Sequence, residues 1–414
     1  MSLKNRYKGK WLLITSFGFL YALIVVLLSL AFRFFPAAVS LENQFFDRIQ
    51  KNIVIDSKSD YLYQRYQNSI EDLFFINLDS TFFNLETNRL RRNKLAELFT
   101  QINNAKAPID LIFFDYSYSD QIVDKSTLSA SLDALDAPLI LPINFEILGD
   151  IARKGQSSII TKDRLHQIHT PDYETPHTAY AVPFEDPYTN SNRYFKYVLD
   201  DDSFTSVPLS MFQLSKYQDQ PLTIQPKDIN EIHFILRNQD ILGEERAVLL
   251  YDAADIINSS IPPDYLQDQL TNKVLVIGLF EDYKTKYLNP IDKFITPVDA
   301  KMSGALMITN AFLNLTNDIH YVSDKWWLLF IINFLAAIII SLNYEKSISS
   351  RYISLIALGF NLVISVFIFY FLAFSFYVFL SIKLSLGMSL LIYQKKYYLY
   401  SWYQQWWRDR SPSN

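Results

Sequence analysis

The stretch Asp72–Asp79 reads DLFFINLD, a short apolar run with a carboxylate at each end. The stretch Ile109–Asp115, IDLIFFD, repeats the pattern. Short continuous apolar runs are typical of strands that are buried on both faces of a sheet. Between the two runs, Pro108 ends a segment in which apolar residues recur at helical spacing, namely Leu95, Leu98, Phe99 and Ile102. The sequence therefore predicts a strand, a helix and a second strand in succession.

The same alternation of strands and helices continues on the C-terminal side of this unit. Ser126 is expected to cap a helix, and 139–145 to form a third strand. Lys273–Leu279, KVLVIGL, is the last clear strand, and a helix follows Gly304. Further strands are expected at 194–199, 232–236 and 248–251 and a helix at 208–216, whereas the polar stretch 151–187 is interpreted as an irregular insertion. We therefore expect an α/β fold with a mixed, largely parallel sheet, flanking helices and right-handed crossovers.

Apolar stretches at both ends of the chain predict four transmembrane helices. Residues 11–32 carry no charge, and at about 1.5 Å per residue they cross a hydrocarbon core of about 30 Å. A cleaved signal peptide is the alternative for this stretch, because small residues follow it at 36–40. The second span is expected at 326–342, beginning at a Trp pair, and the long apolar stretch after it predicts a hairpin with spans at 352–372 and 377–393.

The charges beside these spans predict how the chain is oriented. The N-terminus 1–10, the link 343–351 and the tail 394–414 together carry ten basic and two acidic residues. Because basic residues concentrate on the cytoplasmic side of bilayers, we expect both termini in the cytoplasm. The domain 33–325 carries 27 basic and 41 acidic residues and is expected on the other side, in the periplasm of a bacterium whose inner membrane holds the spans.

The composition excludes several kinds of chemistry. The chain has no cysteine, which excludes disulfides, thiolate metal sites and a thiol nucleophile. It contains neither a GxxxxGK[ST] nor a GxGxxG motif, so no phosphate-binding loop is expected, and its acidic domain is not expected to bind nucleic acid. Five potential metal ligands lie close together but match no zinc spacing: His166, His169, Asp172, Glu174 and His177. We therefore expect no metal, no cofactor and no enzymatic activity.

A series of short motifs follows a fixed order along the chain. They are LENQFFDR after the first span, FFINLD ending in Asp79, Arg92 and Ala96 in RNKLAELFTQI, IDLIFFDYSYSD, Asp124, KVLVIGL and MSGALMITNAFLNL. This order, with one span before and three after, resembles the type-two CHASE domain, an extracytoplasmic sensory domain of bacterial histidine kinases and nucleotide cyclases. The likeness covers Glu42 to about Tyr393. It departs from the family in lacking a Trp-Pro pair at 86–91, in placing Thr309 where the family has a histidine, and in the insertion around His166.

The resemblance implies a sensor or receptor that detects a ligand or an envelope state and transmits it through its transmembrane helices. Most members carry a catalytic output domain after the last span, whereas the tail 394–414 is too short for one. We therefore expect the signal to pass to a separate protein partner in the cytoplasm or the envelope, from a chain that could form a homodimer. The alternative is a non-catalytic structural or assembly subunit of a cell-envelope membrane complex.

Candidate site residues come from two places in the chain. Asp79, Asp115 and Asp282 lie at or just after the carboxyl ends of predicted strands, where open α/β sheets place their ligand crevices. If they converge, they favour a cation or a hydroxyl-rich ligand, although carboxylates at these positions also cap turns and helices. Four other residues are assigned to the membrane or partner interface: Lys383, the one ionisable residue within a predicted span, and Trp402, Trp406 and Trp407 of the basic, aromatic tail.

Overall fold

The computed structural model divides the chain into two compact units. Gln50–Tyr321 form one unit, called the sheet domain below, and Met1–Ile49 together with Val322–Asn414 form the other. The structure describes residues 15–16, 18–24, 26–27, 44, 61–78, 88–115, 126–143, 145–147, 165–167, 177–181, 183–186, 191–199, 205–224, 226, 229–242, 248–280, 293–299, 301–319, 330–331, 334–335 and 338.

A six-stranded sheet forms the centre of the sheet domain, and every pair of neighbouring strands in it is parallel. Its order is β10-β1-β11-β2-β3-β6. The strands are β1 (Leu73–Asn77), β2 (Leu111–Phe114), β3 (Leu139–Ile143), β6 (His177–Tyr180), β10 (Leu250–Asp252) and β11 (Val274–Gly278). The two apolar runs that predict the fold are therefore not neighbours, because the much later strand β11 lies between them and pairs with both.

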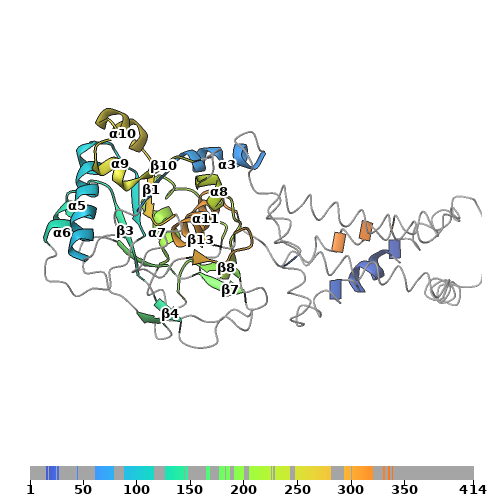
Figure 1. Ribbon diagram of the computed structural model, residues 1–414. Coiled ribbons are helices and arrows are strands. Elements are labelled where there is room, and N and C mark those ends of the chain that lie inside the picture. Colours follow the sequence, from blue (N-terminus) through green and yellow to red (C-terminus); the bar gives the residue numbers. More distant parts are fainter. Residues whose placement is uncertain are drawn as a thin grey trace, which may run out of the picture. The chain divides into compact units, whose positions relative to one another are not determined.

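Helices cover one face of this sheet, as Figure 1 shows. They are α5 (Asn88–Asn104), α6 (Ser126–Asp133), α9 (Ala253–Ile257) and α10 (Pro263–Leu270). Alternate strand residues, among them Phe74, Ile112 and Leu275, point into the core on this side. They pack against apolar residues of the helices, of which Leu98 and Phe99 on α5 have no exposed surface.

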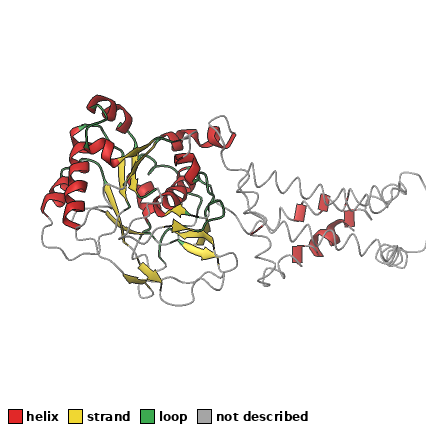
Figure 2. Cartoon of the chain, in the orientation of Figure 1, coloured by secondary structure: helices red, strands yellow, loops and turns green. Residues whose placement is uncertain are grey.

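Three helices cover the opposite face, giving three layers of helix, sheet and helix (Figure 2). They are α3 (Tyr61–Glu71), α7 (Val207–Leu214) and α11 (Gly304–Thr316). α7 begins after an N-cap at Ser206, with Pro208 in its first turn. α11 is buried along its whole length and contacts β11, α7 and α3, so it lies at the centre of this layer.

Smaller elements complete the domain. A three-stranded antiparallel sheet contains β7 (Phe184–Asp186), β8 (Ser191–Lys196) and β9 (Ile229–Glu231). Two antiparallel pairs join β4 (Phe145–Ile147) to β5 (Leu165–Gln167) and β12 (Lys293–Phe294) to β13 (Met302–Ser303). The short helix α8 (Asn238–Leu242) precedes β10.

Most of the predicted elements are confirmed, and three predictions need correction. The stretch 151–187 is not wholly irregular, because it contains β5, β7 and the edge strand β6. The predicted strand at 232–236 is wrong: β9 ends at Glu231, and the main chain of His233, Ile235 and Leu236 bonds to asparagine side chains of α11. The helix predicted from Ser126 is confirmed, although Ser126 is its first residue and not its cap.

The second unit is described only at residue 44 and at parts of the first two predicted spans. Residues 18–24 are helical, and a Cβ built on Gly18 would lie 3.2 Å from Cε2 of Phe334, so the two stretches pack closely there. Phe19 and Phe330 also meet edge to face, with ring centroids 5.2 Å apart. Within the described residues, no helix combines the length and the hydropathy that crossing a membrane requires. The third and fourth predicted spans lie outside the described residues.

Candidate functional site

At the carboxyl edge of the six-stranded sheet, two neighbouring strands are followed by helices on opposite faces of the sheet. The next described helix after β2 is α6, on one face, whereas the next described helix after β11 is α11, which follows β12 and β13 and lies on the other face. β11 and β2 are neighbours, paired from Val274 with Leu111 to Ile277 with Phe114. In parallel α/β sheets such a divergence opens a crevice beyond the strand ends, and ligands bind there.

Asp115 and Gly278 face each other at this point of divergence. The N–H of Asp115 donates to the carbonyl of Ile277 over 2.7 Å, which holds Asp115 beside the end of β11. A Cβ built on Gly278 would lie 3.3 Å from the Cβ of Asp115 and only 2.8 Å from the Cβ of Ala305. Position 278 therefore has room for glycine alone, and this lets the first turn of α11 approach both strands.

A shallow crevice opens to solvent beside Asp115. Its enclosed space is about 10 Å³, enough for about one water molecule, so a larger ligand has to displace side chains of the lining to enter. Among the described residues of its lining, Asp115 is the only charged one, and the others are Ala181, Pro183, Phe195, Phe294, Gly304, Met307 and Ile308. Phe195 and Phe294 come from β8 and β12, so strands outside the central sheet complete the wall. One carboxylate in such a wall suits a compact ligand that carries a hydrogen-bond donor on an apolar body.

A buried asparagine ties together the neighbouring strand ends. Asn77, the last residue of β1, has no exposed surface. Its amide nitrogen donates to Oδ1 of Asp252 at the end of β10 over 2.8 Å, and its amide oxygen accepts the N–H of Phe280 over 3.2 Å. Asn77 thus links the ends of β10, β1 and β11. Because the first turn of α11 packs against Gly278 of β11, this link also holds in place the strand on which α11 begins.

α11 is held on its outer side by a ladder of asparagine side chains. The amide oxygen of Asn310 accepts the N–H groups of Ile235 and Leu236 at 2.7 and 2.8 Å, and its nitrogen donates to the carbonyl of Leu236 at 3.0 Å. Asn314, one turn later, accepts the N–H of His233 at 2.8 Å and donates to its carbonyl at 2.7 Å. These bonds satisfy main-chain groups that would otherwise be buried without partners, so 233–237 and α11 form one packed piece.

The sequence-predicted site residues are only partly described. Asp115 lies at the carboxyl end of β2, as predicted, and lines the crevice. Asp79 and Asp282 lie outside the described residues, as do Lys383, Trp402, Trp406 and Trp407. Of the candidate metal ligands, His166 and His177 fall in β5 and β6, and the others are not described. Among the described residues, no group of three or more histidines and carboxylates could hold a metal ion.

Sequence reasoning missed Asn77, Asp252 and the asparagine ladder. A recognisable signal existed for the ladder alone: Asn310, Asn314 and Asn317 recur at helical spacing within an otherwise apolar helix. Thr309, which stands where the resembled family has a histidine, is fully buried and donates to the carbonyl of Ala305. It therefore serves the helix main chain and does not line the crevice.

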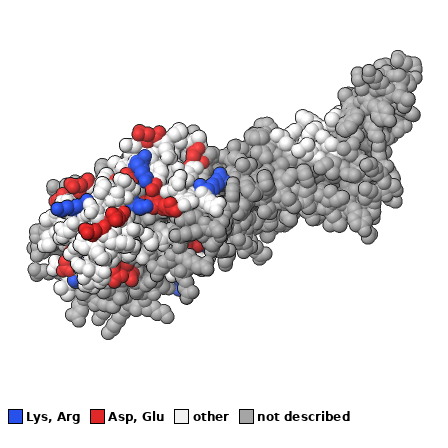
Figure 3. Space-filling model, turned by 90° about the horizontal axis from the view of Figure 1, so that it is seen from above, with Lys and Arg blue, Asp and Glu red and all other residues white. Residues whose placement is uncertain are grey.

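The surface and the comparisons add no further site. Figure 3 shows acidic and basic side chains interspersed on the described surface seen from above, without a field of one sign. In comparisons with known proteins, the chain matches no family model, no curated protein and no solved structure. The candidate site therefore depends on its own geometry.

Proposed function

We propose that the chain is a membrane-anchored sensor whose sheet domain lies outside the cytoplasm and binds a small ligand in the crevice beside Asp115. The observation that carries the proposal is the position of this crevice. It lies at the point of divergence between β11 and β2, and the first turn of α11 forms part of its wall. The signal would pass to a separate protein partner.

The lining of the crevice supports one class of ligand. Carboxylate oxygens such as those of Asp115 accept hydrogen bonds from ammonium and hydroxyl groups. The rings of Phe195 and Phe294 favour an apolar or aromatic body and also attract a cation. A small amine with an aromatic or aliphatic body meets both conditions.

The membrane anchor is supported by the side chains of the second unit. Residues Tyr21, Ala22 and Val26 are buried, whereas apolar residues of the same two stretches are exposed: Phe19, Leu20, Leu23, Leu27, Ile331 and Leu335. A helix that is apolar on its packed face and also on its exposed face is typical of a membrane span, because lipid then replaces water as its surroundings. This agrees with the uncharged stretch 11–32.

Three probes with the same ring test the ligand site: benzylamine, benzyl alcohol and benzoate. We expect benzylamine to raise the thermal unfolding midpoint of the full-length protein in mild detergent most, and benzoate least. Asp115→Asn should weaken benzylamine binding by about tenfold or more, because a charge-assisted hydrogen bond is lost. The matched control is Asp136→Asn, since Asp136 is exposed in the turn between α6 and β3. Equal binding of benzylamine to all three proteins would refute the site.

Cysteine labelling tests the orientation, because the natural chain has no other thiol. Cells that carry Asp136→Cys are treated with a maleimide that does not cross the inner membrane. We expect complete labelling once the outer membrane is opened. Labelling that appears only after the inner membrane is lysed would place the sheet domain in the cytoplasm and contradict the proposal.

A further inference from the structure

We infer that α11 transmits a displacement from the crevice to α3, and that the contact between Asn317 and Ser69 is where the displacement arrives. This inference rests on the proposed function in taking the crevice as the place where the signal begins. α11 contains 13 residues, which corresponds to a length of about 20 Å. Its two ends therefore reach two separate parts of the sheet domain.

The first turn of α11 belongs to the crevice. Gly304, Met307 and Ile308 form part of the lining, and Ala305 lies against Gly278 at the end of β11. Ser303 caps the helix, its hydroxyl oxygen accepting the N–H of Leu306 over 3.2 Å. A ligand that enters the crevice must therefore press on the first turn of α11 or replace contacts that this turn makes.

The last turn of α11 binds α3 directly. The amide nitrogen of Asn317 donates to Oγ of Ser69 over 2.9 Å, and the Ser69 hydroxyl donates to the amide oxygen of Asn317 over 3.2 Å. Asn317 also donates to the carbonyl of Leu313, so its side chain is fixed to the helix it ends. We call this pair of residues the α3–α11 contact.

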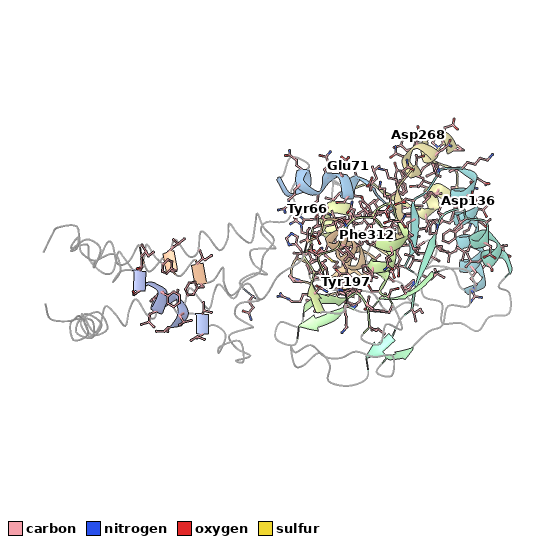
Figure 4. The ribbon with its side chains drawn as sticks, turned by 180° about the vertical axis from the view of Figure 1, so that it is seen from behind. Tyr66, Glu71, Asp136, Tyr197, Asp268 and Phe312 are labelled. Carbon is pink, nitrogen blue, oxygen red and sulfur yellow. The ribbon has the colours of Figure 1, made fainter. Side chains whose placement is uncertain are left out.

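A second set of contacts connects the same two helices through His233. The Asn314 side chain holds both main-chain groups of His233, and the imidazole ring lies 6.5 Å from the ring of Tyr66 on α3, edge to face. Figure 4 labels Tyr66 on α3 and Phe312 in the body of α11. Burial, with a smaller effect of Arg65, lowers the pKa of His233 to about 4, so this ring is neutral at neutral pH. Its contact with Tyr66 is one of packing.

The position of these helices in the chain gives the contact its significance. α3 follows the first predicted span, and α11 ends at Thr316, ten residues before the second predicted span begins at 326. A change in the α3–α11 contact is therefore a change between the parts of the chain that lead to two different spans. Helix shifts of about 1–2 Å at such contacts are a known way of passing a signal.

A substitution at Gly278 can displace α11 without any ligand. A Cβ at position 278 would lie 2.8 Å from the Cβ of Ala305, which is not the end of a flexible side chain, so α11 must move away from β11 in Gly278→Ala. Ala305→Gly removes the opposing atom and should relieve the displacement. G278A thus perturbs the position of α11, and G278A/A305G is the matched variant that should reverse the perturbation.

Disulfide formation between Ser69→Cys and Asn317→Cys measures the contact in the full-length protein, which contains no other thiol. Because the two natural side chains are hydrogen-bonded, the rate at which the cysteines form a disulfide under mild oxidation reports changes in the separation of these positions. We expect G278A to slow the reaction about three- to tenfold and the added A305G to restore it to within about twofold. Leu98→Ala in the opposite core serves as a destabilised control that should leave the rate unchanged.

Two results would overturn the inference: an unchanged rate in folded G278A, or an equal slowing by L98A. If G278A does not fold, benzylamine is used in its place to perturb the crevice. A thermal unfolding midpoint that benzylamine raises without any change in the disulfide rate then also overturns the inference. That last result leaves the crevice intact as a ligand site. Conversely, slowing by G278A with reversal by A305G, in a protein that does not bind benzylamine, supports transmission by α11 and refutes the proposed ligand.

Discussion

The two apolar runs that predict the fold each carry an aspartate near either end, and the ends differ in what surrounds them. At the amino edge of the sheet, Asp72 accepts hydrogen bonds from the phenol of Tyr217 and, over 2.7 Å, from the Lys216 ammonium. Asp110 accepts the main-chain N–H of Lys216 at 3.0 and 3.2 Å. At the carboxyl edge, Asp115 lines a crevice. We therefore propose different roles for strand ends of similar sequence, one in stability and the other in binding.

The largest effect on stability is expected at the amino edge. Asp72→Ala removes the acceptor of Tyr217 and Lys216 together, and we expect it to lower the free energy of unfolding by about 2–3 kcal/mol. Urea unfolding of the full-length protein followed by circular dichroism measures the loss. Benzylamine affinity should not change, because the crevice is at the other edge. A tenfold loss of affinity in D72A would mean that the two edges are coupled and would break the comparison.

A smaller effect on stability is expected for Tyr217, and this effect depends on pH. Burial, and then the hydrogen bond to Asp72, raise the pKa of Tyr217 well above its usual value of 10. Above pH 10 the unfolded chain loses this proton while the folded chain keeps it, so stability falls as pH rises. Tyr217→Phe should cost about 1 kcal/mol at pH 8 and should flatten the alkaline loss between pH 9 and 11. Tyr197, whose pKa burial also raises, accounts for a residual slope. If the slope of stability against pH is unchanged in Y217F, the alkaline loss of stability comes from other groups.

The smallest effect on stability is expected for Asp115→Asn. This residue is only partly buried, and the substitution preserves its shape, so the free energy of unfolding should change by less than about 0.5 kcal/mol. The same protein should lose benzylamine affinity by about tenfold. Together, D72A and D115N should show opposite patterns of stability and binding. A destabilisation of 2 kcal/mol or more by D115N would give Asp115 a structural role like that of Asp72.

Patterns that are local in the sequence gave reliable predictions. The apolar runs became β1 and β2, the spaced apolar residues between them became α5, and KVLVIGL became β11. These elements bury side chains on faces that their own periodicity defines. Asp115 could be placed at a strand end for the same reason.

Predictions failed where a segment depends on a distant partner. Apolar residues at 232–236 suggested a strand, but the main chain there bonds to the side chains of Asn310 and Asn314, about 75–80 positions later. The composition of the segment does not distinguish it from a strand. β6 was missed because a four-residue edge strand with polar residues has no distinctive period. The insertion of β11 between β1 and β2 likewise follows from pairing across the domain, which no local pattern specifies.

The asparagine ladder has a consequence for how helices and extended chains can be joined. Asn310 and Asn314 are four residues apart on a helix, an axial spacing of about 6 Å, and they bind main-chain groups that are two to three residues apart, at His233, Ile235 and Leu236. A helix with asparagine at every fourth position can therefore run antiparallel beside an extended chain and recognise its backbone regardless of side-chain identity, so Asn-x-x-x-Asn in an apolar helix predicts such a neighbour.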